Sequence, residues 1–429
     1  MSVIFSAPLA LFVLGALSAN AQPTTTTGQP TENVDQATYT VTDYNPDTDY
    51  FPEKVATDHS AFWSVEYFNS YKVVTDSFSN YTYVMYQRGT PEPVLEELNL
   101  APTMGTSIFP VPLGTLTVDQ TIPLRFLEVL GDLQNLKYAP ASTYQYATSA
   151  CLQKIGETSN YTLSDDAELR RAQIDSTDLH MVAQSMHPEK DTEEYFIYTD
   201  GITSDPGVLH RAEWIEYLSL PMNKEKIASD DFAIVRDNYM SYNETMASVT
   251  GDKPKVAWIT TGDNYGPAPD YAIDGKKWEI VDAGYKHEYM RDANLEAIPA
   301  GRYLENNKTD FYNAIKDADL VIDESYFYGI KNSTYFMTTY NISEADAAEY
   351  KFLQATPHAV FGPEGTINEN YGSDWFESAV YYADRVLLDI IQISRPDEAI
   401  VQNHTRTWFY NFATETPFII TSANCTTEF

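Results

Sequence analysis

Three loops that follow predicted strands are rich in aromatic and amide side chains: Asn264-Tyr265, Tyr326-Phe327-Tyr328, and Asn370-Tyr371 with Trp375 close behind. Aromatic rings give a large contact area at a low entropic cost, and their polar tips can orient a ligand. This composition is typical of a site for a bulky planar or amphipathic ligand. The residues predicted to bind it are Leu113, Thr115, Tyr265, Tyr326, Tyr328, Tyr371 and Trp375. For each ring taken singly, packing in a core or hinge stays an equal alternative.

No catalytic motif is complete in the sequence. A G-x-S-x-G elbow, a P-loop and a G-x-G-x-x-G after a strand are all missing. His287-Glu288 begins like the zinc motif H-E-x-x-H, but Arg291 stands where the second histidine belongs. We therefore predict no catalytic residue, no metal ligand and no cofactor, although a zinc or manganese site assembled from distant loops stays open. Carboxylate pairs such as Asp323-Glu324 are common in so acidic a chain, so a solvated surface is the favoured interpretation of any one pair.

The first part of the chain, residues 51–205, shows a mixed pattern of strands and helices. Residues 64–77 and 81–88 are dense in Val, Tyr, Phe and Thr and are separated by a Ser-Asn turn, which predicts a hairpin. Residues 121–130 place Ile122, Phe126 and Val129 on one helical face, and Gly131 ends this helix. We assign this part to an N-terminal α/β lobe.

The middle of the chain, residues 206–250, is helical over an unusual length. Ala212, Ile215 and Leu218 fall on one stripe, and the pattern continues beyond Pro221. Because proline lacks an amide hydrogen, we expect one long connecting helix that is kinked near Pro221. Two consecutive core helices are the alternative.

Residues 251–400 return to alternating strands and helices. Strands are predicted over residues 256–261, 318–323 and 358–361, and helices over residues 309–316 and 373–393, the second capped by Ser373. Such alternation predicts mostly parallel sheets with ligands beyond the carboxyl ends of the strands. The expected fold class is therefore α/β, with two lobes joined by a long inter-lobe helix and a C-terminal tail over residues 401–429.

The first 21 residues are typical of a signal peptide. Their apolar run, residues 7–17, is shorter than the roughly 20 residues that span a bilayer, and Ser18-Ala19-Asn20-Ala21 fits an A-x-A cleavage site. No basic residue precedes the run, and a buried strand or helix is the alternative. Residues 22–50 are rich in Thr and Pro and are predicted to form a flexible leader, because they bury too little apolar area to offset chain entropy.

Eight N-x-[ST] sequons favour a eukaryotic secretory route. The predicted glycosylation sites are Asn80, Asn160, Asn243, Asn307, Asn332, Asn341, Asn403 and Asn424. In an oxidising compartment the two cysteines, Cys151 and Cys425, are expected to form one disulfide, with two unpaired thiols as the alternative. We expect the protein to be secreted or displayed at the cell surface.

The net negative charge of the chain limits the classes of macromolecule that it can bind. The 429 residues carry 27 Lys and Arg against 62 Asp and Glu, a formal net charge of −35, which disfavours nucleic acid and anionic lipid. A hydrophobic content of 43% rules out global disorder. We expect a monomer that neither binds nucleic acid nor inserts into a membrane, with a small-molecule ligand and a membrane receptor or transporter as further partner.

The order of segments resembles the class III periplasmic substrate-binding proteins, the group that includes cobalamin-binding and ferric-siderophore-binding proteins of ABC importers. It also resembles secreted eukaryotic relatives of that group, including algal proteins implicated in cobalamin acquisition. The resemblance covers residues 55–412, and the stretches that carry it are residues 62–67 (FWSVEY), 71–74 (YKVV), 83–91 (YVMYQRGTP), 126–131 (FLEVLG), 211–216 (RAEWIE), 254–259 (PKVAWI), 318–323 (ADLVID) and 374–378 (DWFES). It implies two α/β lobes joined by a fairly rigid helix, with the ligand between them and little closure. The sequons and the Thr-rich leader depart from a bacterial periplasmic protein, and no short motif of this group fixes the ligand.

Three functional hypotheses follow. The leading one is a secreted, non-catalytic protein that captures a bulky nutrient, a corrinoid or a ferric siderophore, in the cleft between the lobes. The second is a secreted hydrolase that uses Asp323 or Glu324 in that cleft as acid or base. The third is a metal-binding or cell-wall protein in which Tyr and acidic groups serve adhesion.

Overall fold

The computed structural model describes residues 29–98, 100, 104–157, 161–186, 195–261, 277–304 and 308–426. The expected signal peptide, Tyr265 and the sequons at Asn160 and Asn307 lie outside these residues. Within them, no helix is both long enough and apolar enough to span a membrane.

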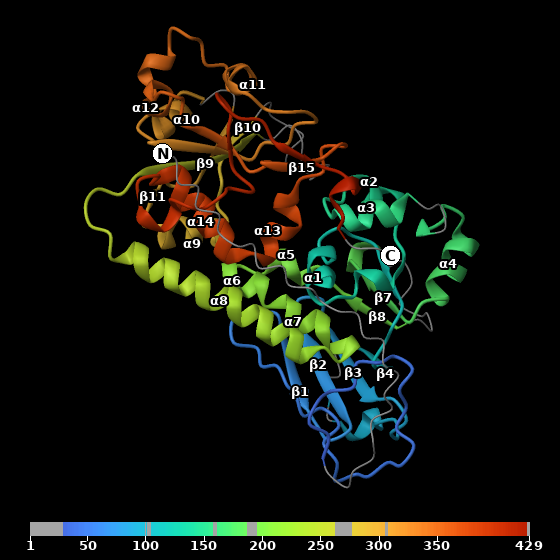
Figure 1. Ribbon diagram of the computed structural model, residues 1–429. Coiled ribbons are helices and arrows are strands. Elements are labelled where there is room, and N and C mark those ends of the chain that lie inside the picture. Colours follow the sequence, from blue (N-terminus) through green and yellow to red (C-terminus); the bar gives the residue numbers. More distant parts are fainter. Residues whose placement is uncertain are drawn as a thin grey trace, which may run out of the picture.

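The N-terminal lobe contains two four-stranded sheets (Figure 1). The first has the order β1-β2-β3-β4, in which only β3 and β4 are parallel, and the second has the all-parallel order β6-β5-β7-β8. The strands are β1 (Trp63–Tyr67), β2 (Tyr71–Asp76), β3 (Tyr81–Gln87), β4 (Gly105–Val111), β5 (Leu116–Val118), β6 (Leu136–Tyr138), β7 (Leu179–Val182) and β8 (Phe196–Tyr198). The helices are α1 (Leu124–Val129), α2 (Ala141–Tyr146), α3 (Ala150–Gly156), α4 (Ala167–Asp175) and α5 (Gly201–Ser204).

Two local predictions for this lobe are confirmed. The hairpin joins β2 to β3, and its turn contains Asn80 at a φ of 54°, a left-handed conformation that asparagine tolerates. Residues 64–77, expected as one strand of the hairpin, form both β1 and β2. The helix α1 ends before Gly131, which has a φ of 71°.

The middle of the chain forms three helices instead of one kinked helix. They are α6 (Val208–Ala212), α7 (Trp214–Ser219) and α8 (Glu225–Ala247), and Pro221 lies in a 3-10 turn between α7 and α8. The helical conformation is interrupted at Asn223, because its φ of 55° cannot continue a right-handed helix. The 23-residue α8 packs against α7 and α14 and runs along both lobes (Figure 1). Its buried face follows the spacing of an amphipathic helix through Phe232, Val235 and Tyr239.

The C-terminal lobe is built on a seven-stranded sheet of order β12-β10-β9-β13-β14-β16, with β11 paired to β9. Its strands are β9 (Lys255–Thr261), β10 (Lys277–Ile280), β11 (Glu296–Ala297), β12 (Gly301–Leu304), β13 (Leu320–Asp323), β14 (Val360–Gly362) and β16 (Tyr410–Asn411), and β15 (Thr366–Asn368) pairs separately with β17 (Phe418–Ile420). Its helices are α9 (Gly284–Asp292), α10 (Lys308–Ile315), α11 (Ser333–Thr339), α12 (Lys351–Gln354), α13 (Ser378–Tyr381) and α14 (Ala383–Ser394). The mixed α/β class is thus present, and the central pairings β9–β13 and β13–β14 are parallel, as expected.

The region predicted as one helix over residues 373–393 is interrupted twice. Ser373 caps a 3-10 turn, Asp374–Phe376, by accepting a hydrogen bond from the Trp375 amide. The non-helical backbone of Glu377 and of Tyr382 then separates this turn from α13, and α13 from α14.

One hydrophobic core continues through both lobes. Trp214 and Tyr217 of the middle helices belong to the same buried cluster as Trp258 and Leu320 of the C-terminal sheet. A second cluster around Phe311 and its neighbours covers the opposite face of that sheet, since alternate residues of β9 and β13 belong to the two clusters. A shared apolar core favours a fixed arrangement of the lobes.

Residues 29–50 pack against the N-terminal lobe, which differs from the flexible leader that composition predicts. Val41 is 7% exposed, and its amide donates to the Arg88 carbonyl oxygen. Asn33 donates from Nδ2 to the Glu53 carbonyl oxygen and to Glu225 Oε2. Specific hydrogen bonds, together with the burial of Val41, hold this polar segment.

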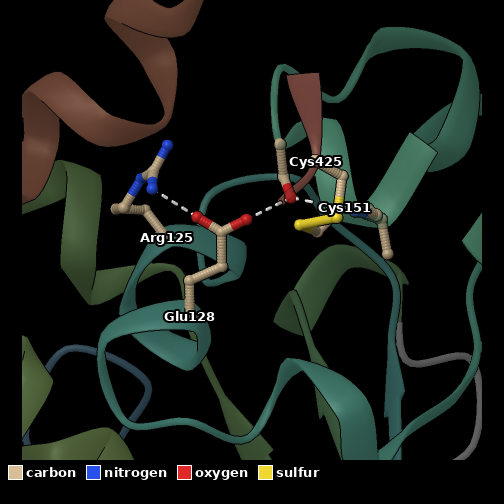
Figure 2. Close-up of a disulfide and its surroundings, with 6 residues drawn as sticks. Arg125, Glu128, Cys151 and Cys425 are labelled. Carbon is tan, nitrogen blue, oxygen red and sulfur yellow. Dashed lines mark hydrogen bonds and ion pairs between the residues drawn. A yellow bond between two sulfur atoms is a disulfide. The ribbon is translucent and has the colours of Figure 1, made fainter. Parts of the chain in front are cut away.

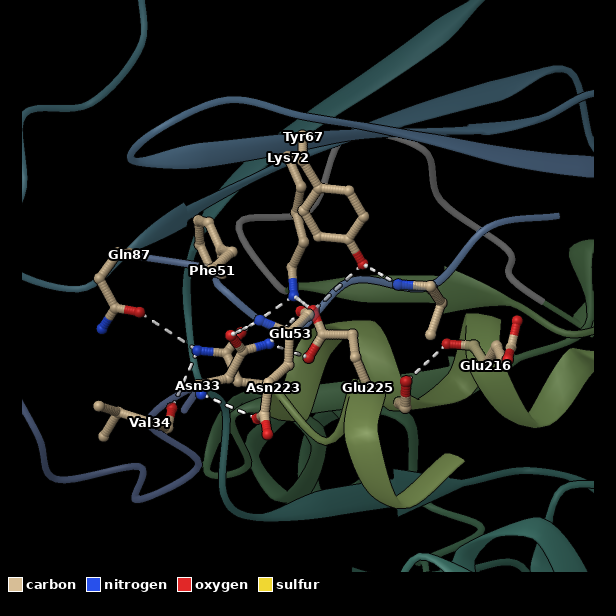
Figure 3. Close-up of polar contacts among 12 residues, drawn as sticks. Asn33, Val34, Phe51, Glu53, Tyr67, Lys72, Gln87, Glu216, Asn223 and Glu225 are labelled. Atoms are coloured by element: carbon tan, nitrogen blue, oxygen red, sulfur yellow. Dashed lines mark hydrogen bonds and ion pairs between the residues drawn. The ribbon is translucent and has the colours of Figure 1, made fainter. Parts of the chain in front are cut away.

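A buried ion pair lies where residues 29–50, β2 and the start of α8 meet (Figure 3). Lys72 Nζ is 2.5 Å from Glu225 Oε1, and both side chains are fully buried. Lys72 also donates to Asn223 Oδ1 at 3.0 Å, at the break before α8. The pair therefore fixes the first residue of the long helix against the first sheet.

Residues 401–426, expected as a tail, belong to the C-terminal lobe. They supply β16 to the main sheet and β17 to β15, and Trp408 is 1% exposed. Cys425 then forms a disulfide with Cys151 of α3, which links the end of the described chain to the N-terminal lobe (Figure 2).

Candidate functional site

The loop after β13 exposes three consecutive aromatic rings. Tyr326, Phe327 and Tyr328 are 53%, 42% and 58% exposed. Tyr371, in the loop after β15, is 40% exposed, and its ring centroid is 4.9 Å from that of Tyr328. Two loops that are far apart in sequence thus form one surface, here called the aromatic patch: Tyr326, Phe327, Tyr328 and Tyr371.

Buried polar groups hold the loop after β13 in place. Asp323, the last residue of β13, accepts hydrogen bonds from the Tyr340 hydroxyl at 3.0 Å and from the Ser325 amide at 2.9 Å. Lys331, at the other end of the loop, donates to the carbonyl oxygens of Asp323 and Ser325. The Lys331 side chain therefore joins the two ends of the loop, and these bonds restrict the backbone that carries the exposed rings.

Lys331 also forms an ion pair with Glu364, whose carboxylate lies 2.7 Å from Lys331 Nζ. Burial raises the pKa of Glu364 to about 7, although Lys331 acts in the opposite direction. The base of the patch thus contains a carboxyl group that titrates near neutral pH.

The loop after β15 is bonded to the N-terminal lobe. Asn368 Nδ2 donates to the carbonyl oxygens of Gln145 and Ala147, at 2.8 and 3.0 Å. Asn368 Oδ1 accepts from the amides of Asn370 and Gly372, which shapes the turn that presents Tyr371. Tyr371 itself has a φ of 62°, in the left-handed region that a ring-bearing residue rarely adopts. The conformation of this aromatic residue is thus set by contacts across the lobe junction.

A groove lies beside this turn, at the junction of the lobes. Its volume is about 360 Å³. The N-terminal lobe contributes residues of α2 and α3, and the C-terminal lobe contributes the loop after β15; the lining residues are Ala141, Tyr144, Gln145, Gln153, Gly156, Glu157, Asn368, Glu369, Asn370 and Ser422. Amides, carboxylates and one phenol ring are groups that hydrogen-bond a polar ligand.

The groove and the aromatic patch are adjacent, because Asn370 lines the groove and Tyr371 belongs to the patch. A volume of about 360 Å³ is near the lower end for small-molecule sites. A ligand larger than the groove must therefore extend over the exposed rings. The combined surface can hold the polar edge of a molecule in the groove and an apolar face against tyrosine.

Three residues predicted to bind the ligand do not join this surface. Trp375 is 5% exposed and packs against Trp258 and Phe409, with ring centroids 5.7 and 5.4 Å away. Leu113 is buried in the shared core. The Thr115 hydroxyl is 3.0 Å from Asp178 Oδ2. Of the predicted residues that the structure describes, these three make packing or turn-forming contacts, whereas Tyr326, Tyr328 and Tyr371 lie together.

The groove residues Gln145 and Gln153 were missed by the sequence analysis, and Asn370 was noted only as part of an aromatic loop. No local pattern marks them, since α2 and the loop after β15 are more than 200 residues apart in the chain.

The carboxylates of the hydrolase hypothesis are both engaged in structural contacts. Asp323 is buried and bonded as described above. Glu324 Oε2 accepts from Trp258 Nε1 at 2.7 Å and lies 2.5 Å from Lys286 Nζ, and these Glu324 and Lys286 side chains are only 10% and 5% exposed. Neither group faces the groove. Among the described residues, no cluster of three His, Cys, Asp or Glu side chains could hold a metal ion.

A buried polar contact joins the lobes one residue after Ala147, whose carbonyl oxygen accepts from Asn368. The Thr148 hydroxyl lies 2.7 Å from Asp374 Oδ1 and 2.8 Å from Glu377 Oε2. The Thr148 hydroxyl donates to both carboxyl groups, and its backbone amide donates to Glu377 as well, so two acidic side chains share one donor residue. Burial, followed by the charge of Asp374, raises the pKa of Glu377 to about 8, which matches a protonated carboxyl at neutral pH.

The N-terminal side of this contact includes an ion pair and the disulfide (Figure 2). Arg125 pairs with Glu128 on α1, and Glu128 accepts a hydrogen bond from Ser149, which caps α3. Cys151, which forms the disulfide with Cys425, lies on the same helix, α3. The walls of the groove are thus held by covalent and polar contacts.

Most described sequons are accessible. Asn80, Asn332, Asn341, Asn403 and Asn424 are exposed, whereas Asn243, within α8, is half-buried. Asn332 and Asn424 also use their Oδ1 atoms to cap helical turns.

Neither a protein-family model nor a curated protein sequence matches the chain. Among solved structures, the chain is similar to a periplasmic heme binding protein from Pseudomonas aeruginosa, with a TM-score of 0.48 and 10% identity over 71% of this chain and 99% of that one. It is also similar to the siderophore binding protein BauB, bound to a complex between two molecules of acinetobactin and ferric iron, with a TM-score of 0.47 and 10% identity over 67% and 95% of the chains. CeuE of Helicobacter pylori with Ni(II) bound gives a TM-score of 0.44 and 11% identity over 67% and 85%. With TM-scores below 0.5, these likenesses do not identify a ligand for this chain.

Proposed function

We propose that the protein is a non-catalytic solute-binding protein that captures a bulky amphipathic ligand at the junction of its two lobes. The observation that supports this most is the adjacency of the inter-lobe groove and the exposed pair Tyr328–Tyr371. Exposed aromatic rings grouped on one surface are a common mark of a binding site. The polar groove gives such a ligand an orientation, and the rings give it contact area.

The ligand class we propose is a corrinoid or a ferric siderophore. Both present a broad face larger than the groove and carry hydrogen-bonding groups at their edge. The lobes would serve as a fixed scaffold with little closure, because they share one core and a disulfide. We further propose that the protein acts as a secreted monomer, with delivery to a membrane receptor or transporter.

Isothermal titration with cyanocobalamin, a ferric hydroxamate and heme tests the proposal. We expect saturable binding of cyanocobalamin or of the ferric hydroxamate with a stoichiometry of one, and no chemical change of the recovered probe. No heat with either of these two, whether or not heme binds, would overturn the ligand proposal. Turnover of glycan or ester substrates that Asp323→Asn abolishes would favour the hydrolase instead.

A further inference from the structure

A second groove, larger than the one at the lobe junction, lies at the far edge of the C-terminal sheet. Its volume is about 690 Å³, within the range of cavities that hold drug-sized molecules. It is bounded by the end of α14, the segment 404–407, the edge strand β16 and the first residue of β17. None of its lining residues belongs to the lobe-junction groove or the aromatic patch.

The walls combine apolar rings with polar side chains. Phe361, Phe409 and Phe418 line it together with Thr405 and Gln392. Phe418 is 57% exposed, so one ring of the wall is accessible from solvent. A pyranose ring matches such a surface, because its C–H face packs on an aromatic ring while its hydroxyl and acetamido groups meet hydrogen-bonding partners.

A glycosylation sequon lies at the rim of this groove. Asn403 is exposed, and the two residues that complete its sequon, His404 and Thr405, both line the groove. A sugar attached to Asn403 therefore starts one residue from the cavity. At Asn424, by contrast, the asparagine Oδ1 accepts a bond from the Thr421 amide, and its two following residues line neither groove.

The turn that carries Asn403 is fixed to α14. Gln392 Nε2 donates to the carbonyl oxygens of Val401 and His404, at 3.1 and 2.8 Å. His404 Nε2 lies 2.5 Å from Asp389 Oδ1, and Asp389 is fully buried. A rigid attachment point lowers the entropic cost of ordering the sugar beside it.

From this geometry we propose that Asn403 carries an N-linked glycan whose core N-acetylglucosamine units lie in the 690 Å³ groove and cover the ring of Phe418. The proposal rests on passage through a secretory pathway, but it does not depend on the identity of any solute or on the site at the lobe junction. The groove is then a binding site for the protein's own glycan, and the exposed apolar ring of β17 is covered by it.

The test is the rate at which a peptide-N-glycosidase releases each glycan from the full-length protein, secreted by a eukaryotic host and kept native. Site occupancy is measured by peptide mass spectrometry, with Asn80, exposed in a hairpin turn, as the reference site. We expect release from Asn403 to be about tenfold slower than from Asn80, since cleavage requires local opening of the packed glycan. After denaturation the two rates should be equal.

Two variants of neighbouring residues distinguish a loss of glycan packing on Phe418 from a general loss of protein stability. Phe418→Ser should bring the Asn403 release rate up to that of Asn80. Ile419→Ser, which changes a neighbouring apolar residue that is 45% exposed and does not line the groove, should leave the protection intact. The proposal is overturned if Asn403 is unmodified while Asn80 is modified, if both glycans are released equally fast from the native wild type, or if the two variants behave alike.

Discussion

Replacing Lys72 by methionine tests how the long helix is fixed to the N-terminal lobe. Lys72 and Glu225 are both fully buried, and their charged atoms are 2.5 Å apart (Figure 3). Burial lowers the pKa of Lys72, whereas the charge of Glu225 raises it. Methionine keeps the length and the apolar stem of the side chain but removes the charge, so Glu225 is left buried without a cation.

Removing one partner of a buried ion pair destabilises a protein by about 3–5 kcal/mol. Loss of the donor to Asn223 Oδ1 adds a further loss of about 1 kcal/mol. We therefore expect Lys72→Met to lower the free energy of unfolding by about 4–6 kcal/mol in urea titrations. Glu225 still accepts two hydrogen bonds in this variant, from Asn33 Nδ2 and from the Tyr67 hydroxyl. These bonds keep the loss of unfolding free energy within this range.

Two further variants make the reasoning refutable. Lys72→Met combined with Glu225→Gln should recover more than half of the loss, because the uncompensated charge is gone. Lys226→Met, one residue along α8, removes an exposed pair with Asp230 and should leave the unfolding midpoint unchanged. If Lys72→Met behaves like Lys226→Met, or if Glu225→Gln gives no recovery, the buried pair does not hold the helix as argued.

Three other perturbations have defined outcomes. Burial raises the pKa of Glu216 and of Glu377 to about 8 from the ordinary value of 4.5, so the folded state holds protons that the unfolded state releases. The free energy of unfolding should therefore fall as the pH rises from about 4.5 to about 8, and Glu377→Gln should flatten the slope of Tm against pH; a Tm that rises over this window contradicts this. Cys151→Ser removes a link between residues 274 positions apart and should cost up to about 5.6 kcal/mol by the chain-entropy relation, while reduction of the Cys151→Ser protein should change nothing more. Gly372→Val should weaken ligand binding and lower Tm, because a Cβ at this position would lie 1.9 Å from the Tyr146 carbonyl oxygen; a variant as stable as the wild type would show that the two loops are not in contact.

The elements that depend on local pattern were predictable from the sequence. The strands near residues 256–261 and 320–323 begin with runs of apolar residues, and the helix before Gly131 stops just ahead of this residue with positive φ. Hydrophobic periodicity and turn residues act over a few positions, so one sequence suffices to find them.

The breaks within helices were harder to predict. Pro221 signals an interruption, but the left-handed Asn223 that separates α7 from α8 is stabilised by a distant partner, Lys72. In the same way, residues 29–50 look too polar to fold, yet Asn33 is held by Glu225, 192 positions away. Contacts between distant segments leave no periodic signal.

The candidate site was predictable only in part. A tyrosine in a loop after a strand can line a ligand site or a core, and composition alone did not separate exposed Tyr328 from buried Trp375. The groove depends on Asn368 meeting the carbonyl oxygens of α2 and the residue after it, a pairing that no spacing within either segment encodes.

The most direct test of the central claim is the dissociation constant of cyanocobalamin for Tyr371→Ala, compared with the wild type and with Tyr44→Ala. Tyr44 is a matched control, because it is 38% exposed and stacks on another tyrosine, Tyr50, in the N-terminal segment. Loss of one stacked ring should weaken binding about tenfold in Tyr371→Ala and leave Tyr44→Ala at the wild-type value. Equal affinities for all three proteins, in the presence of measurable binding, would contradict a ligand site at the aromatic patch.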